Sequence, residues 1–384
     1  MKKIYLDYAS TTPVNPQVIK AMLPYFDQKF ANPASLHSAG QEAKQALDES
    51  RQLLADALGA KENEIYFTAS ATESNNTVIK GVALANQNRG RHIIVSAVEH
   101  DCILESAKYL KRQGFKVTKL KVNNLGQINL DELEQAITDE TTLVSVIHGN
   151  NEIGTINDIG KIGKICREKK IYFHTDASQS FGKVEIDVEK MKIDLLTASS
   201  HKMYGPKGVA LLYARNDVLI SPLLHGGGQE FGLRSSTVNV AGIVGFAKAV
   251  ELCVKEMTTE AKRLSKLRDK VIKEILKLVP NSYLNGHSKK RLPNNISIRF
   301  DYAEGEAILM LLNEEGIAVS TGSACSSKSL QASHVLLACG LKQEQSHGSI
   351  RITLGRRTTK KEVDYLLDVL PKIIKKLRQM SPFS

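Results

Sequence analysis

The residues from Asp194 to Gly208 contain the side chain with the most distinctive chemistry in the chain, Lys202. A short apolar strand pattern runs into two hydroxyls and a histidine, and a turn containing glycine and proline follows. A lysine that is desolvated or close to other cations loses its proton easily and can form a Schiff base with a carbonyl compound or pyridoxal phosphate. A lysine after a strand is more often a solvated loop residue. The other polar segments of the chain must therefore decide whether Lys202 is a functional lysine or a solvated loop residue.

Polar residues also follow other predicted strands. One strand pattern ends in Thr68-Ala-Ser-Ala-Thr-Glu, which opens a helix near Thr72. Free N–H groups at such a start bind phosphate, although the same residues satisfy an ordinary capping box. Two later strands run into His100 and Asp176. A carboxylate at the edge of a sheet is costly unless it is paired, and a protonated ring nitrogen facing Asp176 would remove that cost.

Strand and helix patterns alternate through the first 213 residues. Strands are predicted at 64–68, 91–97, 115–121, 142–148, 171–176, 195–198 and 209–213, and helices at 38–58, 72–86, 102–113, 130–137 and 159–169. This alternation predicts an α/β fold with a mainly parallel seven-stranded sheet between helices. In an open sheet of this kind, ligands bind beyond the carboxyl ends of the strands, where the polar residues fall.

The pattern changes after Tyr213. A long helix is predicted at 238–278, followed by strands at 295–300, 317–320 and 349–353 and helices at 304–315, 329–338 and 359–378. The first residues, Ile4-Tyr-Leu-Asp, form a short strand pattern that suits an arm laid against another element. We therefore expect a large domain at 15–257 and a smaller α+β domain made of 1–14 and 258–384.

Composition narrows the class of protein. Of 384 residues, 42% are apolar and 24% charged, as in an ordinary globular enzyme, and no apolar run is long enough for a membrane span. Five cysteines without C-x-x-C spacing argue against a disulfide framework and a metal site, and favour the cytoplasm. The net charge of +11 would suit polyanions, but acids interleave the basic residues, so we favour a solvated surface and expect no direct nucleic-acid partner.

Longer motifs resemble a known family. Ser199-Ser-His-Lys-Met-Tyr-Gly-Pro-Lys-Gly resembles the lysine signature of the class V aminotransferase group of fold-type I pyridoxal-phosphate enzymes, and His174-Thr-Asp-Ala-Ser-Gln resembles its cofactor-binding Asp and Gln. More narrowly, the chain resembles the NifS/IscS-type cysteine desulfurases from about residue 4 to its C-terminus. Further matching motifs are Leu6-Asp-Tyr-Ala-Ser-Thr-Thr-Pro, Ala71-Thr-Glu-Ser-Asn-Asn, Val98-Glu-His, Asn150-Asn-Glu-Ile-Gly, His225-Gly-Gly-Gly-Gln-Glu, Arg234-Ser-Ser-Thr and Ser320-Thr-Gly-Ser-Ala-Cys-Ser.

The resemblance implies pyridoxal 5'-phosphate as cofactor and a role for each matching residue. Lys202 would hold the cofactor and later move the α-proton of the substrate, while His100 would stack on the ring and assist. Asp176 would pair with the ring nitrogen, and Gln179 would bond the ring hydroxyl. The remaining cofactor-binding set would be Ala71, Thr72, Ser199, His201, Asn151 and, from the second subunit of a homodimer, Thr237. Asn151 and Arg351 would bind the carboxylate of the substrate, L-cysteine.

Cys325 distinguishes this family from its relatives. The resemblance implies that its thiolate attacks the substrate sulfur, leaving alanine and a persulfide on Cys325. The persulfide sulfur would pass to an iron–sulfur scaffold protein or to another acceptor, such as one that serves tRNA thiolation. Cys166, Cys253 and Cys339 are instead expected to be core residues.

Several other functions are weighed against this interpretation. The chain has no G-x-S-x-G elbow, which argues against an esterase, and no common nucleotide-binding motif. A selenocysteine lyase or a class V aminotransferase remains an alternative, because fold does not fix the reaction. A non-enzymatic scaffold for iron–sulfur assembly partners, acting through the basic C-terminal helix, is expected only as an added role.

Overall fold

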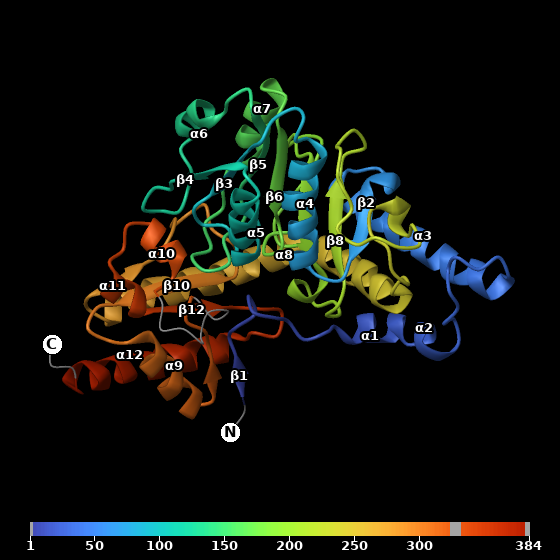
Figure 1. Cartoon of the computed structure of the whole chain (residues 1–384). Coiled ribbons are helices and arrows are strands. Elements are labelled where there is room, and N and C mark those ends of the chain that lie inside the picture. The colour runs from blue at the N-terminus through green and yellow to red at the C-terminus, as the bar shows by residue number, and fades with distance from the viewer. Residues whose placement is uncertain (1–2, 323–331, 381–384) are drawn as a thin grey trace.

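A seven-stranded sheet forms the centre of the larger part of the molecule (Figure 1). The structure is a computed structural model that describes residues 3–322 and 332–380. The strands of this sheet are β2 (Ile65–Thr68), β3 (His92–Ser96), β4 (Lys116–Leu120), β5 (Thr141–Ser145), β6 (Tyr172–Asp176), β7 (Leu195–Ser199) and β8 (Ala210–Ala214). They lie in the order β2-β8-β7-β6-β5-β3-β4. All seven strands predicted from the sequence are therefore present.

The pairing of these strands is parallel except at β8, which runs antiparallel to both β7 and β2. Every residue of β3, β5, β7 and β8 is buried, as expected for strands covered on both faces. β4 lies at one edge and carries the exposed residues Lys116 and Lys119, whose charges disfavour pairing with a strand of another chain. The predicted α/β class with a mainly parallel sheet is confirmed.

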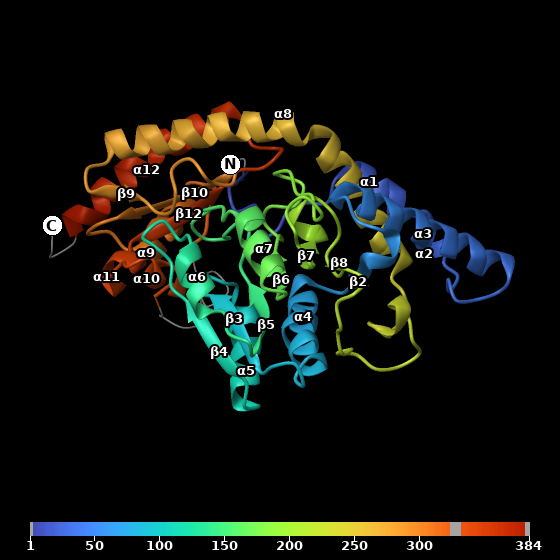
Figure 2. The ribbon, with the colours of Figure 1, turned by 90° about the horizontal axis from the view of Figure 1, so that it is seen from above.

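Helices cover both faces of the sheet (Figure 2). They are α3 (Ser38–Leu58), α4 (Ala71–Ala85), α5 (Asp101–Arg112), α6 (Leu130–Ala136), α7 (Ile159–Glu168) and α8 (Val240–Leu278). Apolar residues of α4 and α5 pack on one face, and those of α3, α7 and the first half of α8 pack on the other. α3 ends at Gly59, whose φ of 67° is the left-handed conformation that glycine adopts without strain.

A smaller α+β part follows in the chain. Its strands are β9 (Ser282–Leu284), β10 (Asn295–Phe300), β11 (Ile317–Ala318) and β12 (Ser349–Thr353), and its helices are α9 (Gly305–Glu314), α10 (His334–Ala338), α11 (Gln343–His347) and α12 (Lys360–Met380). β10 pairs antiparallel with both β12 and β9. The N-terminal strand β1 (Ile4–Tyr5) pairs with β11, and Ile4 and Leu6 join the apolar core of this part. The predicted arm is therefore laid against the smaller part.

The long helix α8 contributes to the cores of both parts. Phe246 and Val250 lie in the core beside the sheet, whereas Val271 and Ile275 lie in the core of the smaller part. The connector predicted at 238–278 is thus one helix of 39 residues. Because α8 is continuous through 257 and 258, the domain boundary proposed there stays a prediction.

Some elements differ from the sequence expectation. β9 and α11 were not predicted, and the short helices α1 (Pro16–Met22) and α2 (Pro24–Asp27) lie in a segment that was read as irregular. The strand predicted at 317–320 ends at Ala318. Each of these elements is short, so its residues form no long periodic pattern. Within the part of the chain that the structure describes, no helix is long and apolar enough to cross a membrane.

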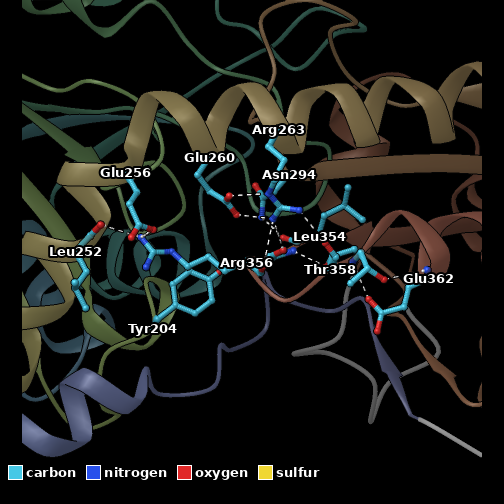
Figure 3. A network of polar contacts seen from close by, with 12 residues as sticks. Tyr204, Leu252, Glu256, Glu260, Arg263, Asn294, Leu354, Arg356, Thr358 and Glu362 are labelled. Atoms are coloured by element: carbon cyan, nitrogen blue, oxygen red, sulfur yellow. Dashed lines mark hydrogen bonds and ion pairs between the residues drawn. The ribbon is translucent and has the colours of Figure 1, made fainter.

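A polar network joins the turn after Lys202 to the chain that leaves β12 (Figure 3). The Tyr204 hydroxyl accepts a hydrogen bond of 2.8 Å from the backbone N–H of Arg356. The Arg356 guanidinium lies over the Tyr204 ring and donates to the carbonyl of Leu252 on α8, at 3.0 Å. This network fixes the larger part against the smaller part close to Lys202.

Arg263 on α8 holds the same segment from the other side (Figure 3). Its guanidinium donates to the carbonyls of Gly355 at 3.1 Å and Thr358 at 2.8 Å, and it pairs with Glu260. The planar fork of arginine suits several acceptors at once, which a lysine cannot match.

Replacing Arg263 with Ala should lower the free energy of unfolding by about 2 kcal/mol, because the substitution leaves several backbone carbonyls without their charged donor. Urea denaturation followed by circular dichroism measures the change. Lys262→Ala, an exposed position one residue earlier on α8, is the control and should change stability by less than about 0.5 kcal/mol. Equal stabilities of the two variants would show that the network does not hold the parts together.

Candidate active site

A cavity of about 850 Å³ lies between the carboxyl ends of the sheet strands and the smaller part. It brings together most of the residues predicted from the sequence. Those that line it are Ala71, Thr72, His100, Asn151, Asp176, Gln179, Ser199, His201, Lys202 and Arg351. The expectation that polar groups at successive strand ends meet at one edge of the sheet agrees with this geometry.

Lys202 ends a single 3₁₀ turn, Ser200–Lys202, that follows β7 directly. Its Nζ donates to the carbonyls of Ala9 at 2.6 Å and Ser10 at 2.7 Å. The Ala9 carbonyl also accepts a hydrogen bond of 2.9 Å from Nε2 of Gln179. The N-terminal segment therefore reaches the amine and helps to place it.

Asp176 is the last residue of β6, and only 5% of it is exposed. Its Oδ2 accepts a hydrogen bond of 2.8 Å from Nδ2 of Asn75, and its Oδ1 accepts one of 2.9 Å from the backbone N–H of Ser178. Within the described residues, Asp176 forms no ion pair. A buried carboxylate that faces a cavity in this way fits a protonated ring nitrogen of a bound group.

The start of α4 shows the capping role that the sequence left open and leaves room for the other, anion binding. Ser70 caps the helix, since its hydroxyl accepts a hydrogen bond of 3.1 Å from the backbone N–H of Glu73. Glu73 in turn accepts one of 3.1 Å from the N–H of Ala69 and pairs with Arg234. The capping arrangement is therefore present, and Thr72, in the same turn, still faces the cavity. The helix dipole there favours an anion.

Two histidines line the cavity in different electrostatic settings. His100 caps α5, and its Nδ1 lies 3.1 Å from the thiol sulfur of Cys102. His201 lies 3.1 Å from the Thr11 hydroxyl. Burial, and then the positive charge of Lys202, lowers the pKa of His201 to about 4. His201 is consequently neutral at pH 7 and offers one N–H donor.

Arg351 on β12 lies on the side of the cavity formed by the smaller part, and only 3% of it is exposed. Its Nη2 donates to Asp7 Oδ1 and to the Ser10 hydroxyl, both at 2.9 Å, and its Nη1 donates to the Asn151 carbonyl at 3.1 Å. Its Nε has no hydrogen-bond partner in the described part of the chain. A buried donor of this kind fits the carboxylate of a ligand.

One predicted residue within the described part of the chain does not line this cavity. Thr237 lies beside a separate hollow of about 150 Å³, together with Ala69 and Arg234. Cys325 lies outside the described residues. Gly322 and Ala332, the described residues on either side of that segment, both line the cavity. Cys166, Cys253 and Cys339 are buried, as expected.

The sequence reasoning missed several residues of the site. Asn75, Ser10 and Glu152 line the cavity but were given no role. All three stand inside motifs that resemble the family, so the signal was present without an indication of which residues face inward. The chemistry of the set is acid–base and anion-binding. Within residues 3–322 and 332–380, no group of three or more His, Cys, Asp and Glu side chains could hold a metal ion.

Glu99, next to His100, is a buried acid behind the cavity wall. Its Oε1 accepts hydrogen bonds of 2.6 Å from the Ser96 hydroxyl and from the backbone N–H of Ile147. Burial raises the pKa of Glu99 from 4.5 to about 8. The side chain is therefore mostly protonated at pH 7, and no fixed negative charge stands behind His100.

Comparisons with known proteins agree with this geometry. Residues 4–366 match the family model described as aminotransferase class-V. A cysteine desulfurase IscS of Methanosarcina thermophila is 51% identical over 383 residues, covering 100% of this chain and 95% of the relative. One of Dictyoglomus turgidum is 51% identical over 382 residues, covering 100% and 97%. The solved structure of a NifS-like protein is 39% identical, covers 98% of this chain and 100% of its own, and superposes with a TM-score of 0.92.

The raised pKa of Glu99 has a consequence for stability. The folded protein binds this proton more tightly than the unfolded chain, so its contribution is complete below about pH 4.5 and is lost as pH rises through about 8. Glu99→Gln should flatten the decline in unfolding free energy between pH 5 and 8.5, by on the order of 3 kcal/mol. Urea midpoints measured across this range test it. Parallel profiles for the two proteins would show that Glu99 ionises normally.

Proposed function

The chain belongs to the class-V aminotransferase family and is a cysteine desulfurase, and from this premise we propose that it converts L-cysteine to L-alanine with pyridoxal 5'-phosphate on Lys202 and a persulfide on Cys325. The observation that carries the proposal is that Lys202 and the buried carboxylate of Asp176 line one cavity. Arg351, on the opposite wall, supplies a buried cation for a carboxylate.

The side chains present fit the proposed cofactor. Asp176 would keep the ring nitrogen protonated, and this pairing resolves the cost of a buried carboxylate without a cation. Gln179 would bond the ring hydroxyl, and His100 would lie against the ring. The remaining cofactor contacts come from Ala71, Thr72, Ser199 and His201. When bound, pyridoxal 5'-phosphate supplies an electron sink for negative charge at the α-carbon of the substrate.

Lys202 is suited to moving the α-proton. Backbone carbonyls of the N-terminal segment hold its Nζ at the cavity wall, so the amine has a defined place whenever it is not bonded to the cofactor. Arg351 and Asn151 would bind the substrate carboxylate and orient the Cα–H bond. A fixed orientation of this kind removes much of the entropic cost of proton transfer.

Cys325 is the proposed sulfur acceptor. Its thiolate would attack the sulfur of the bound cysteine, forming an S–S bond while the Cβ–S bond breaks. The electron pair of the broken bond goes to carbon, which takes up a proton and leaves as alanine. The location of Gly322 and Ala332 at the cavity supports this role, because the segment that contains Cys325 begins and ends there.

The sulfur of the persulfide would pass to an iron–sulfur scaffold protein or to another acceptor, including one for tRNA thiolation. We place this exchange in the cytoplasm, in keeping with the free cysteines at 102, 166, 253 and 339.

The alternatives to a cysteine desulfurase are a selenocysteine lyase or an aminotransferase, and a scaffold role is an addition. Transamination products without sulfide would favour an aminotransferase.

We propose a homodimer as the working unit. The segment that includes α1, α2 and the start of α3 projects from one side of the molecule (Figure 1). It exposes large apolar side chains, namely Leu23, Phe26, Phe30 and Leu36, of which Leu36 is 93% exposed. A projecting group of apolar side chains is typical of an interface. Thr237 would complete the cofactor site of the other subunit, since it lies outside the cavity of its own.

Cys325→Ala should keep the visible absorbance of the lysine-bound cofactor while stopping persulfide formation and sulfide release from L-cysteine. Mass spectrometry of the protein after turnover detects the added sulfur on Cys325. Cys102→Ser is the matched control, since Cys102 also lines the cavity, and it should retain at least half of the sulfide release. If Cys102→Ser stops sulfide release and Cys325→Ala does not, Cys102 is the acceptor.

Lys202→Ala should lose the lysine-linked cofactor.

The dimer proposal predicts complementation between two defective chains. Thr237→Glu should weaken phosphate binding by charge repulsion, and Lys202→Ala removes the amine. Each variant alone should release less than about a tenth of the wild-type sulfide, but chains produced together should regain activity. In a mixed dimer, one site combines an intact Lys202 with the intact Thr237 of the other subunit. Activity that does not recover would place Thr237 outside the partner's site.

A further inference from the structure

One residue, Ser10, touches both ends of the proposed substrate site. Its carbonyl accepts the 2.7 Å hydrogen bond from Nζ of Lys202, and its hydroxyl oxygen accepts the 2.9 Å hydrogen bond from Nη2 of Arg351. Ser10 lines the cavity and is partly exposed to it. The amine that moves the proton and the guanidinium that binds the carboxylate are thus joined through a single residue.

The segment around Ser10 is attached to the elements that carry these two groups. On one side, the backbone N–H of Ala9 donates to the hydroxyl of Thr353, at 2.9 Å, two residues after Arg351 on β12. On the other side, the backbone N–H of Thr12 donates to the carbonyl of His201, at 3.0 Å, one residue before Lys202. Ser10 therefore spans the gap between the smaller part and the end of β7.

The contacts of Arg351 show what the serine hydroxyl does there. Asp7 and Ser10 share Nη2, and the Asn151 carbonyl takes Nη1. Nε is left as a buried donor without a partner in the described chain. Acceptors on the other two nitrogens fix the plane of the guanidinium, and a fixed plane presents Nε to a carboxylate in one orientation.

We propose that Ser10 is a positioning residue that sets the orientation of Arg351 relative to Lys202, and so selects substrates that carry an α-carboxylate. This inference rests on the proposed function. Ser10 acts through Arg351: its hydroxyl holds the guanidinium, while its carbonyl accepts from the Lys202 amine when that amine is not bonded to the cofactor. A substrate without a carboxylate would not depend on the hydroxyl.

Ser10→Ala removes the hydroxyl but keeps the carbonyl that Lys202 uses. The variant should bind pyridoxal phosphate with unchanged visible absorbance and thermal stability. Binding of L-alanine, followed through the change in that absorbance, should weaken by on the order of tenfold, because a charge-assisted hydrogen bond to Arg351 is lost. Binding of cysteamine, which has no carboxylate, should stay within about twofold of wild type. The KM for L-cysteine should rise together with the dissociation constant for L-alanine, and kcat should change less.

Ser10→Thr keeps a hydroxyl and should restore most of the affinity for L-alanine. The inference is overturned if Ser10→Ala binds L-alanine as wild type does, or if it loses L-alanine and cysteamine equally. Sulfide release by the wild-type protein is measured separately. If wild type releases no sulfide from L-cysteine, the proposed function fails, whereas the ratio of the two binding constants still tests Ser10.

Discussion

The carboxylate of Asp176 is the constraint from which the rest of the site follows. β6 carries it into a buried position, and the groups that bind it, Asn75 and the backbone N–H of Ser178, are neutral. Neutral donors lower the cost of burying a charge but do not cancel it. A fold that retains such a charge at the wall of a cavity has a stable partner for it only when a cation occupies the cavity. The protonated ring of the proposed cofactor meets that need.

Two titratable side chains near this carboxylate are mostly uncharged at pH 7. Burial keeps His201 neutral, with its pKa lowered to about 4, and keeps Glu99 protonated, with its pKa raised to about 8. Desolvation is the main cause of both pKa shifts. The same burial that makes the negative charge of Asp176 costly therefore keeps His201 and Glu99 neutral. Lys202 and Asp176 therefore line the sheet side of the cavity next to a neutral His201, with Arg351 opposite.

Much of this could be predicted from the sequence, and the limits have physical reasons. Most strands of the large sheet were predicted because buried strands are nearly continuous apolar runs, whereas β9, with three residues and none fully buried, leaves no such pattern. Asp176, His100 and Lys202 were found because topology brings strand ends together. The contacts of Ser10 and Asp7 with Arg351 join residues more than 340 positions apart, which no local pattern encodes. Thr237 lies beside a separate hollow and would need the proposed second subunit to reach a cofactor, and Cys325 lies outside the described residues.

The cavity divides by origin, and the division bears on which reaction the fold performs. The groups assigned to the cofactor stand on the large sheet and its helices, so they would serve an aminotransferase equally well. The groups assigned to the substrate carboxylate come largely from the smaller part and the N-terminal arm, and Gly322 and Ala332 border the segment of Cys325 on that same side. If these proposed roles hold, reaction specificity depends on how the smaller part is held against the sheet. The contacts of Tyr204, Arg356 and Arg263 close to Lys202 hold the smaller part against the larger part. These contacts would therefore matter to the proposed reaction as much as the cofactor-binding groups do.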